Sequence, residues 1–255
     1  MLVDIHCHIL PGIDDGAQTL EASLEMARAA VSEGITHILC TPHHNNGVYL
    51  NPKHEVILKV AELQAVLDEK EIPLTLFEGQ EVRMSPDLLR RISQNDILFT
   101  DLDDTYILIE FPSMEVPMYA HRVLFELCTN GYTPIIVHPE RNAQIMKNPN
   151  LMIPLIEMGC LSQVTCGSYV GQFGKEIQRV AKGMIECNLA HMLASDAHNL
   201  KRRNFYTKEA YAKLEKEFGI HKVEEYQQVV KDIVNGEKVT KSPPEEYKKK
   251  FSFFG

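Results

Sequence analysis

The feature that most constrains the fold is a regular alternation between short apolar runs and segments with helical spacing. Seven apolar runs are expected as strands: residues 3–10, 35–41, 73–77, 105–110, 134–137, 161–165 and 189–194. Most of them are continuously apolar, which is typical of parallel strands buried on both faces. The segments between them have apolar residues three or four positions apart, as Leu20, Leu24, Ala27 and Val31 show, and this spacing predicts helices.

The order of these elements predicts an α/β fold. The expected helices are residues 19–33, 52–70, 86–93, 118–130, 150–158, 175–187, 207–218 and 222–235. A chain of 255 residues with this alternation fits one TIM-like (β/α) barrel that is short of the usual eight units. A doubly wound open sheet is the alternative. No internal repeat or interdomain linker divides the chain.

Composition narrows the function classes. The formal net charge of −9 argues against general nucleic-acid binding. The six cysteines lack any Cys-x-x-Cys pair, which is typical of a reducing compartment. No apolar run approaches the roughly 20 residues of a membrane span, and no basic segment precedes the first run, so no signal peptide is expected. We expect a soluble cytoplasmic protein.

Side chains that can bind metal ions follow the predicted strands where each one ends. In a parallel barrel these C-terminal ends meet at one mouth. The candidates are His6, His8, Asp15, His43, His44, Glu81, Glu110, His138, Asp196 and His198. Imidazole and carboxylate ligands without thiolate suit Mn, Fe or Zn. Ten candidates exceed the needs of one ion, so the sequence predicts two or three ions.

Two arginines follow two of these strands closely. Arg141 lies three residues after His138, and Arg203 lies five residues after His198. Guanidinium groups beside metal ions recognise phosphate or carboxylate in a bidentate manner. We expect them to clamp an anion, although a surface salt bridge is the alternative for either arginine alone.

Four short motifs occur in a fixed order: His6-Cys7-His8, Thr41-Pro42-His43-His44, His138-Pro139-Glu140-Arg141 and Ser195-Asp196-Ala197-His198. Together they resemble the polymerase-and-histidinol-phosphatase (PHP) family. Residues 11–16, 79–83, 107–112 and 194–200 look like its branch of bacterial protein-tyrosine phosphatases from capsular polysaccharide operons. The resemblance covers the chain from residue 3 to about residue 235.

The resemblance implies a distorted (β/α)7 barrel with three divalent ions at the C-terminal strand ends, most often Mn²⁺, with Fe or Zn as options. By position, His6, His8, Glu81 and Asp196 would hold one ion, Glu81, Glu110 and His138 a second, and Asp15, His43 and His198 a third. Arg141 and Arg203 match the branch's phosphate-contacting arginines. The choice of Asp15 over Asp14 depends on motif alignment, and His44 is extra to the motif.

The implied activity is hydrolysis of phosphotyrosine by a metal-activated hydroxide, without a phosphocysteine intermediate. The implied partner is the C-terminal tyrosine cluster of a bacterial tyrosine kinase that controls capsule or exopolysaccharide synthesis. This partner also allows a peripheral location at the inner membrane face.

Other function classes fit the sequence less well. A cysteine-based phosphatase is excluded because none of the six cysteines begins a Cys-x5-Arg loop. A two-metal amidohydrolase usually needs a lysine at a middle strand end, and no predicted strand here ends in lysine. A non-catalytic docking module has no need for so many converging ligands. A small-molecule phosphomonoesterase, such as a histidinol phosphatase, remains the alternative on the same site.

The end of the chain differs in character from the rest. We predict one domain over residues 1–240 and a basic-aromatic, flexible tail over 241–255. Three lysines at 248–250 precede phenylalanines at 251, 253 and 254. A solvated end is the simplest expectation, and a weak contact with an anionic membrane surface or a kinase partner is the alternative.

Overall fold

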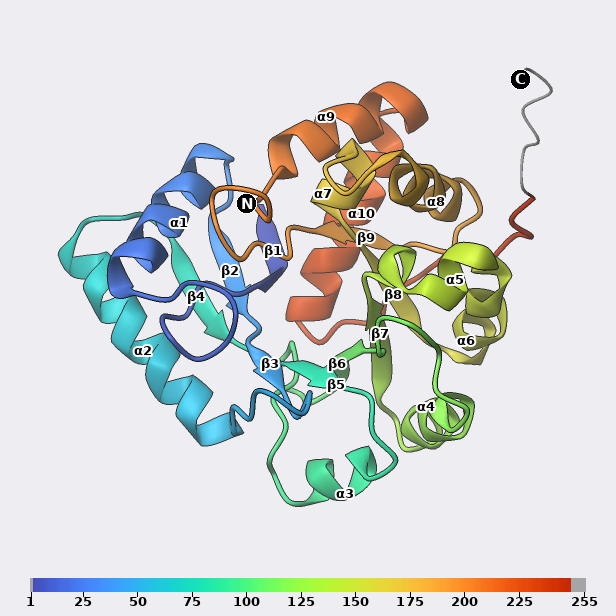
Figure 1. Ribbon diagram of the computed structural model, residues 1–255, viewed down its shortest axis with the longest axis horizontal. Helices are drawn as coiled ribbons and strands as arrows, with labels where there is room; N and C mark the ends of the chain where they lie inside the picture. Colours follow the sequence, from blue (N-terminus) through green and yellow to red (C-terminus); the bar gives the residue numbers. More distant parts are fainter. Residues whose placement is uncertain (1, 249–255) are drawn as a thin grey trace.

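The computed structural model describes residues 2–248, in which parallel strands alternate with helices (Figure 1). One sheet has the order β1-β2-β4, formed by Val3–Cys7, His37–Cys40 and Thr75–Glu78. The other sheet has the order β3-β5-β6-β7-β8-β9, formed by His43–His44, Glu81–Arg83, Tyr106–Glu110, Thr133–Val137, Leu161–Thr165 and Met192–Ala194. All pairings within the two sheets are parallel. The predicted α/β fold with parallel strands is therefore confirmed.

The two sheets are joined by the chain itself. β3 begins three positions after the last residue of β2, and β5 begins three positions after the last residue of β4. Each of these two segments therefore leaves one sheet and enters the other. At the opposite edge, an isolated bridge links Cys7 to Ala197, and the backbone N–H of His8 donates to Ala197 O at 2.9 Å.

Helices cover the outer faces of both sheets (Figure 1). Their bounds are α1 Leu20–Ser32, α2 Lys53–Glu69, α3 Leu88–Ser93, α4 Ala120–Thr129, α5 Ala143–Lys147, α6 Ile153–Met158, α7 Cys166–Val170, α8 Lys175–Glu186, α9 Thr207–Phe218 and α10 Ile220–Val234. Thr19 starts α1 because its Oγ1 accepts from the N–H of Ala22 at 3.2 Å. No helix in residues 2–248 is both long and apolar enough to cross a bilayer.

Alternate residues of β6 separate an inner core from an outer core. Leu108 packs in the inner cluster with Ile5 and Ile135, which come from both sheets. Ile107 and Ile109 pack in the outer cluster that includes α4 and α8. Val229, Val230 and Ile233 of α10 extend the inner cluster. The interior is thus filled by apolar side chains, and polar side chains gather at the C-terminal strand ends.

The segment 241–248 packs on the domain, which differs from the predicted flexible tail. Lys241 Nζ donates to the carbonyls of Ile156 and Cys160 at 2.8 and 2.7 Å. Tyr247 is 9% exposed, and its ring occupies the space beside Gly183 where a Cβ would lie only 2.1 Å away. The glycine therefore makes room for the ring. Residues 249–255, and with them the predicted membrane or kinase contact, lie outside the described residues.

Candidate metal centre

Four ligand atoms converge at the end of β1. His6 and His8 are both buried and project from the same side of the strand because side chains alternate. Their Nε2 atoms lie 3.2 Å apart. Glu81 Oε2 lies 3.4 and 3.3 Å from these two nitrogens, and Asp196 Oδ1 lies 3.4 Å from each. These distances are close to the edge of about 3.4 Å of a tetrahedral shell with ligands about 2.1 Å from an ion. His6, His8 and Glu81 form one group that could hold a cation, and Asp196 adjoins it through both histidines.

Glu81 faces histidines with both of its oxygens. Its Oε1 lies 2.6 Å from His138 Nε2, and its Oε2 lies 2.7 Å from His43 Nδ1. Glu110 Oε2 is 3.8 Å from the same His43 nitrogen. The structure thus groups Glu81 and Glu110 with His43, and His138 adjoins this group through the other oxygen of Glu81. A carboxylate with partners on both oxygens is suited to bridge two ions.

A third group forms around Asp15, whose side chain is 43% exposed. Its Oδ1 lies 3.2 Å from His43 Nε2 and 3.3 Å from His198 Nε2. His8 is part of the same group. All nine predicted ligands therefore lie in one connected cluster. His44 lies outside it, because its Nδ1 donates to Asn51 O at 2.9 Å and its Nε2 lies 3.3 Å from Asp96.

Two buried side chains orient the histidines of β1, and the sequence did not predict this role for either. Asp14 Oδ2 accepts from His8 Nδ1 at 2.7 Å, and Gln163 Oε1 accepts from His6 Nδ1 at 2.9 Å. These bonds place the proton on Nδ1 and leave Nε2 free for a metal ion. Asp14 thus supports a ligand while Asp15 faces the cluster. β8 reads Leu-Ser-Gln-Val-Thr, and a long polar side chain inside a predicted buried strand was the signal for Gln163.

Two site residues have left-handed backbone conformations. His138 has φ 36°, and Asp196 has φ 51°. Non-glycine residues adopt this region rarely, at a cost of order 1 kcal/mol. The N–H of His138 donates to Gln163 O, and the N–H of Asp196 donates to His6 O, both at 2.8 Å. These bonds hold the two ligands where they turn into the cluster.

The electrostatics of the cluster reflect crowded carboxylates and histidines. Burial, together with the charge of Glu81, raises the pKa of Glu110 to about 7. Burial raises the pKa of Asp196, but the guanidinium groups of Arg141 and Arg203 outweigh it and hold that pKa well below its usual range. Burial and Arg141 lower the pKa of His138 to about 3, so its imidazole is neutral. A neutral imidazole is the form that binds metal ions.

The donor atoms fit divalent cations by a second test. Within residues 2–248, His43 Nδ1, Glu81 Oε2, Glu110 Oε2 and His198 Nε2 are buried and form no hydrogen bond of acceptable geometry, although His43 Nδ1 and Glu81 Oε2 lie 2.7 Å apart. Buried polar atoms are normally satisfied, so exceptions gathered in one place call for a ligand. Every one of these atoms belongs to a predicted metal-binding residue, and the set contains no thiolate. Mn, Fe or Zn suit such a mixture of imidazole and carboxylate.

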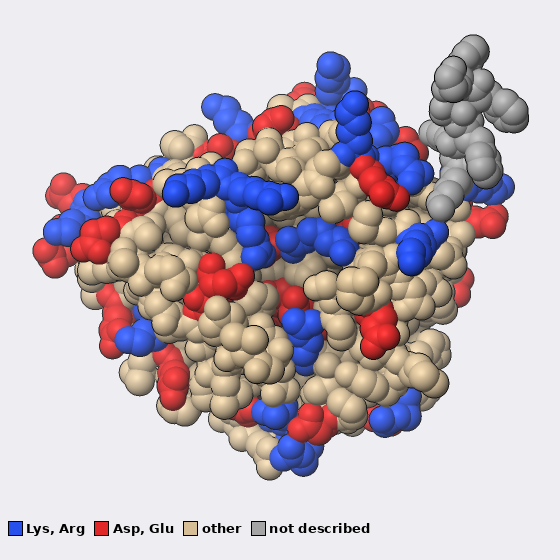
Figure 2. Space-filling view, in the orientation of Figure 1, with Lys and Arg blue, Asp and Glu red and all other residues tan. Residues whose placement is uncertain are grey.

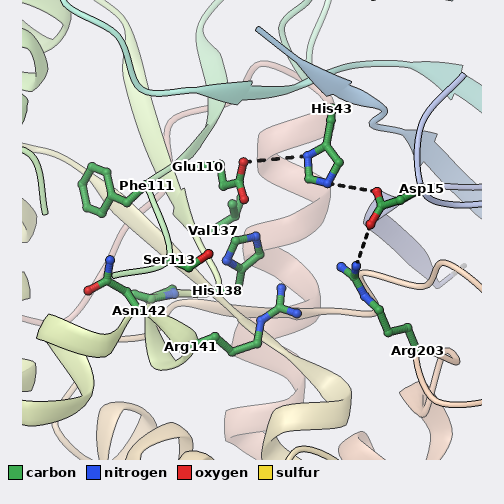
Figure 3. Close-up of a pocket in the computed structure, with 11 residues that line it drawn as sticks. Asp15, His43, Glu110, Phe111, Ser113, Val137, His138, Arg141, Asn142 and Arg203 are labelled. Atoms are coloured by element: carbon green, nitrogen blue, oxygen red, sulfur yellow. Dashed lines mark hydrogen bonds and ion pairs between the residues drawn. The ribbon is translucent and has the colours of Figure 1, made fainter. Parts of the chain in front are cut away.

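Both predicted arginines reach the same cluster beside a cavity of about 340 Å³ (Figure 3). Arg203 lies 3.2 Å from Asp15 and 3.1 Å from Asp196, and Arg141 pairs with Asp196. Asp15, His43 and Glu110 also line the cavity. Arg83, for which the sequence predicted no role, lies 3.0 Å from Glu110. An anion in this cavity would meet two guanidinium groups and the ligand cluster together.

Known proteins are similar to this chain in sequence along nearly its whole length. It is 44% identical to the tyrosine-protein phosphatase YwqE of Bacillus subtilis, over 99% of this chain and 100% of YwqE. It is 38% identical to the putative tyrosine-protein phosphatase CapC of Staphylococcus aureus, over 100% of this chain and 99% of CapC. A crystal structure from work on B. subtilis YwqE and Streptococcus pneumoniae CpsB, described as metal-dependent tyrosine phosphatases, matches with a TM-score of 0.93. That match has 44% identity and covers 97% of this chain and 100% of the other.

A family model described as capsular polysaccharide synthesis, CpsB/CapC, matches residues 2–239. This range contains every strand and helix given above and all the predicted site residues. The resemblance to the capsule-operon branch is therefore confirmed, and the chain belongs to the CpsB/CapC family of capsular polysaccharide synthesis proteins.

Proposed function

We propose that this chain is a metal-dependent tyrosine phosphatase that hydrolyses phosphotyrosine in proteins. The observation that carries the proposal is the convergence of His6, His8, Glu81 and Asp196 on one point beside a cavity with two arginines. The relatives named as tyrosine phosphatases support it, because they match this chain over nearly its full length.

Three divalent ions, most often Mn²⁺, are proposed for the ligand cluster. His6, His8, Glu81 and Asp196 would hold the first ion, Glu81, Glu110 and His138 the second, and Asp15, His43 and His198 the third. When bound, such ions supply a water molecule that is activated near neutral pH and offset the charge of a phosphate. Asp14 and Gln163 keep the β1 histidines in the ligating tautomer.

Arg141 and Arg203 are proposed to bind the phosphate oxygens. Without a phosphate, each guanidinium pairs with Asp196. Among the described residues, none accepts a hydrogen bond from the buried Nε of either arginine, so both retain a donor for an anion. Charge-assisted bonds from two planar groups would fix the phosphate against the cluster and offset charge in the transition state.

The buried thiols of Cys7, Cys40 and Cys166 do not offer a rival nucleophile. Cys7, between the two histidines of β1, is fully buried in an apolar cluster, and burial raises its pKa well above the usual range. Burial likewise raises the pKa of Cys40 and Cys166. A thiol with a raised pKa is a poor nucleophile at neutral pH. We therefore expect hydrolysis without a phosphocysteine.

We extend the proposal to the partner protein, the cellular location and the barrel architecture. We infer a bacterial tyrosine kinase with a C-terminal tyrosine cluster as the partner, and a cytoplasmic location, peripheral at the inner membrane face. We also infer that the two sheets form one distorted (β/α)7 barrel. Two observations support this: β2 with β3 and β4 with β5 are nearly continuous, and the Cys7–Ala197 bridge joins the remaining edges.

Metal removal and substrate choice test the function together. Protein treated with EDTA should lose activity on a phosphotyrosine peptide, and added Mn²⁺ should restore it. Histidinol phosphate should be a poorer substrate under the same conditions. A preference for histidinol phosphate would favour the small-molecule phosphatase instead. Trapping of a covalent phosphoenzyme would contradict direct hydrolysis.

A further inference from the structure

The loop after β9 carries three consecutive cationic residues, Lys201, Arg202 and Arg203. Asn199 fixes this loop, because its Oδ1 accepts from the backbone N–H groups of all three residues at 3.0, 3.1 and 3.4 Å. The N–H groups of His198 and Asn199 donate to Arg203 O at 2.8 and 3.1 Å. The loop is therefore a closed turn that is anchored directly to a predicted ligand.

The three cationic side chains have different surroundings. Arg203 turns inward to Asp15 and Asp196, as described above. Lys201 and Arg202 are exposed, and neither has an ion-pair partner within the described range 2–248. Figure 2 shows Lys and Arg side chains gathered mainly above the central hollow, with a further cationic side chain on its lower rim. In a chain with a net charge of −9, such a cluster creates a local positive field.

Two other loops at the mouth expose apolar side chains and a carboxylate, Glu115, but no Lys or Arg. The Tyr49 ring stacks on His43 at 6.1 Å, which places its loop at the cavity, and Val48 and Leu50 beside it are exposed. After β6, the segment that lines the cavity continues to the exposed Met114 and Met118. Neither 45–51 nor 111–118 contains Lys or Arg. Exposed cations therefore stand beside the phosphate clamp on the loop after β9 and not on these two loops.

We propose that Lys201 and Arg202 form a second anion subsite, which binds an acidic or phosphorylated residue close to the phosphotyrosine in the substrate chain. The inference rests on the proposed function and adds the substrate class. Arg203 would hold the phosphotyrosine phosphate, and a neighbouring residue lies within about 10 Å along an extended peptide. Because the cations occupy one side, an anionic residue on only one flank of the phosphotyrosine reaches them.

The test compares three phosphotyrosine peptides with the Mn²⁺-loaded full chain. One peptide has neutral flanks, one has two Asp residues before the phosphotyrosine, and one has two Asp residues after it. We expect one acidic peptide to have a kcat/KM about fivefold higher, mainly through KM, because the pairs are exposed to solvent. The advantage should fall towards unity in 0.5 M salt, where the Debye length is roughly 4 Å.

Two double variants that each lose two positive charges decide whether the loop after β9 causes the preference for an acidic peptide. K201Q/R202Q should bring the ratio between acidic and neutral peptides close to one. K231Q/K238Q also removes two positive charges, but near the end of α10. The neighbouring Glu237 accepts a hydrogen bond from Tyr106 at the start of β6, which is the end of the strand away from the cavity. This control should keep the wild-type ratio. Thermal unfolding of both variants checks that each remains folded.

Two outcomes would overturn the subsite. One is an equal kcat/KM for all three peptides in the wild type. The other is a ratio of kcat/KM between acidic and neutral peptides that is undiminished in K201Q/R202Q. Loss of binding to phosphatidylserine vesicles in that variant with an unchanged peptide ratio would assign the cations to a membrane surface instead. Hydrolysis of none of the peptides would overturn the proposed function itself, and hydrolysis of all of them at one rate overturns the subsite alone.

Discussion

At the scale of single residues, the metal centre depends on side chains that bind no ion. Asp14 and Gln163 each hold a β1 histidine by its Nδ1 atom. Removal of such an outer partner typically lowers metal affinity 10- to 100-fold, because the ligand loses its tautomer and orientation.

Replacement of Asp14 tests this supporting role. Asp14→Asn keeps an acceptor near His8 and removes the charge, so we expect the Mn²⁺ concentration for half-maximal activity to rise about 10-fold or more. Calorimetric titration with Mn²⁺ should give the same change. Asp68→Asn, at an exposed position on α2, is the matched control and should bind Mn²⁺ as the wild type does. Unchanged affinity in Asp14→Asn would refute the role.

His191 should make the protein sensitive to acid away from the metal centre. It is buried, its Nδ1 accepts from the N–H of Ser162 at 3.0 Å, and burial together with Lys241 lowers its pKa to about 3. Below the unfolded pKa of about 6.5, the unfolded state binds a proton that the native state excludes. The contribution of neutral His191 to the free energy of unfolding is therefore fully present above that pKa. It falls as the pH decreases, by about 2 kcal/mol between pH 6.5 and 5.

The measurement is urea unfolding at pH 7 and pH 5. His191→Asn can keep an acceptor for Ser162 and cannot titrate, so it should lose about 2 kcal/mol less than the wild type over this range. Other titrating groups act equally in both proteins and cancel in the comparison. An identical loss in both proteins would show that His191 is protonated without cost.

The metal ligands could be predicted from the sequence, whereas Asp14 and Gln163, which orient two of them, could not. His43, Glu81 and His138 follow apolar runs, and the ends of parallel strands converge, so sequence order alone predicts their meeting. Gln163 is 157 positions from His6, and nothing in a single sequence pairs the two. Asp14 and Asp15 are adjacent carboxylates, and only the geometry separates the supporting residue from the one that faces the cluster.

At the scale of elements, the β1–α1 loop leaves no space for a side chain at Gly16. A Cβ there would lie 2.1 Å from His8 O and 2.6 Å from His8 Cβ. Gly16→Ala should therefore push the loop away from β1, destabilise the protein by about 1–3 kcal/mol and weaken Mn²⁺ binding. Gly47→Ala, at φ 90° with open space around it, isolates the backbone strain of a positive φ and should leave Mn²⁺ binding unchanged. Mn²⁺ binding that is weakened in both variants, or in neither, would contradict this steric explanation.

The long elements matched their predictions closely, and the shortest ones were missed. Helix α2 and strand β8 have enough residues to show a period, and their bounds differ from expectation by at most one residue. β3 has two residues, too few for any period. α5 lies outside every predicted helix, in a segment where Asn142 Oδ1 accepts from the N–H groups of Gln144 and Ile145 and starts a short helix.

At the scale of the whole molecule, the ligand cluster draws on both sheets. His6 lies in β1 of one sheet and His8 directly follows that strand, whereas Glu81 and Glu110 lie in β5 and β6 of the other sheet and His138 directly follows β7. The division into two sheets was not predictable, because continuous apolar runs do not reveal where a ladder is interrupted. A cation shared by these residues binds the native arrangement and not the unfolded chain, so it stabilises the fold.

Removal of metal ions should therefore lower the unfolding temperature. Mn²⁺ at 100 times its dissociation constant adds about 2.7 kcal/mol, which corresponds to about 5–10 °C for a chain of this size. Differential scanning calorimetry with EDTA and with Mn²⁺ measures the difference. A His6→Gln/His8→Gln variant should show a much smaller Mn²⁺-dependent shift. An equal shift in that variant would place the stabilising ion elsewhere.

The passage of two chain segments from one sheet into the other has a mechanical consequence. His43 is the first residue after the crossing of one segment, and Glu81 is the first strand residue after the crossing of the other. Any rotation of one sheet against the other would therefore change the distances between the ligand atoms. Bound cations would crosslink the two sheets where the segments cross. Loss of the cations would let backbone amides near the crossings exchange with solvent before the rest of the core.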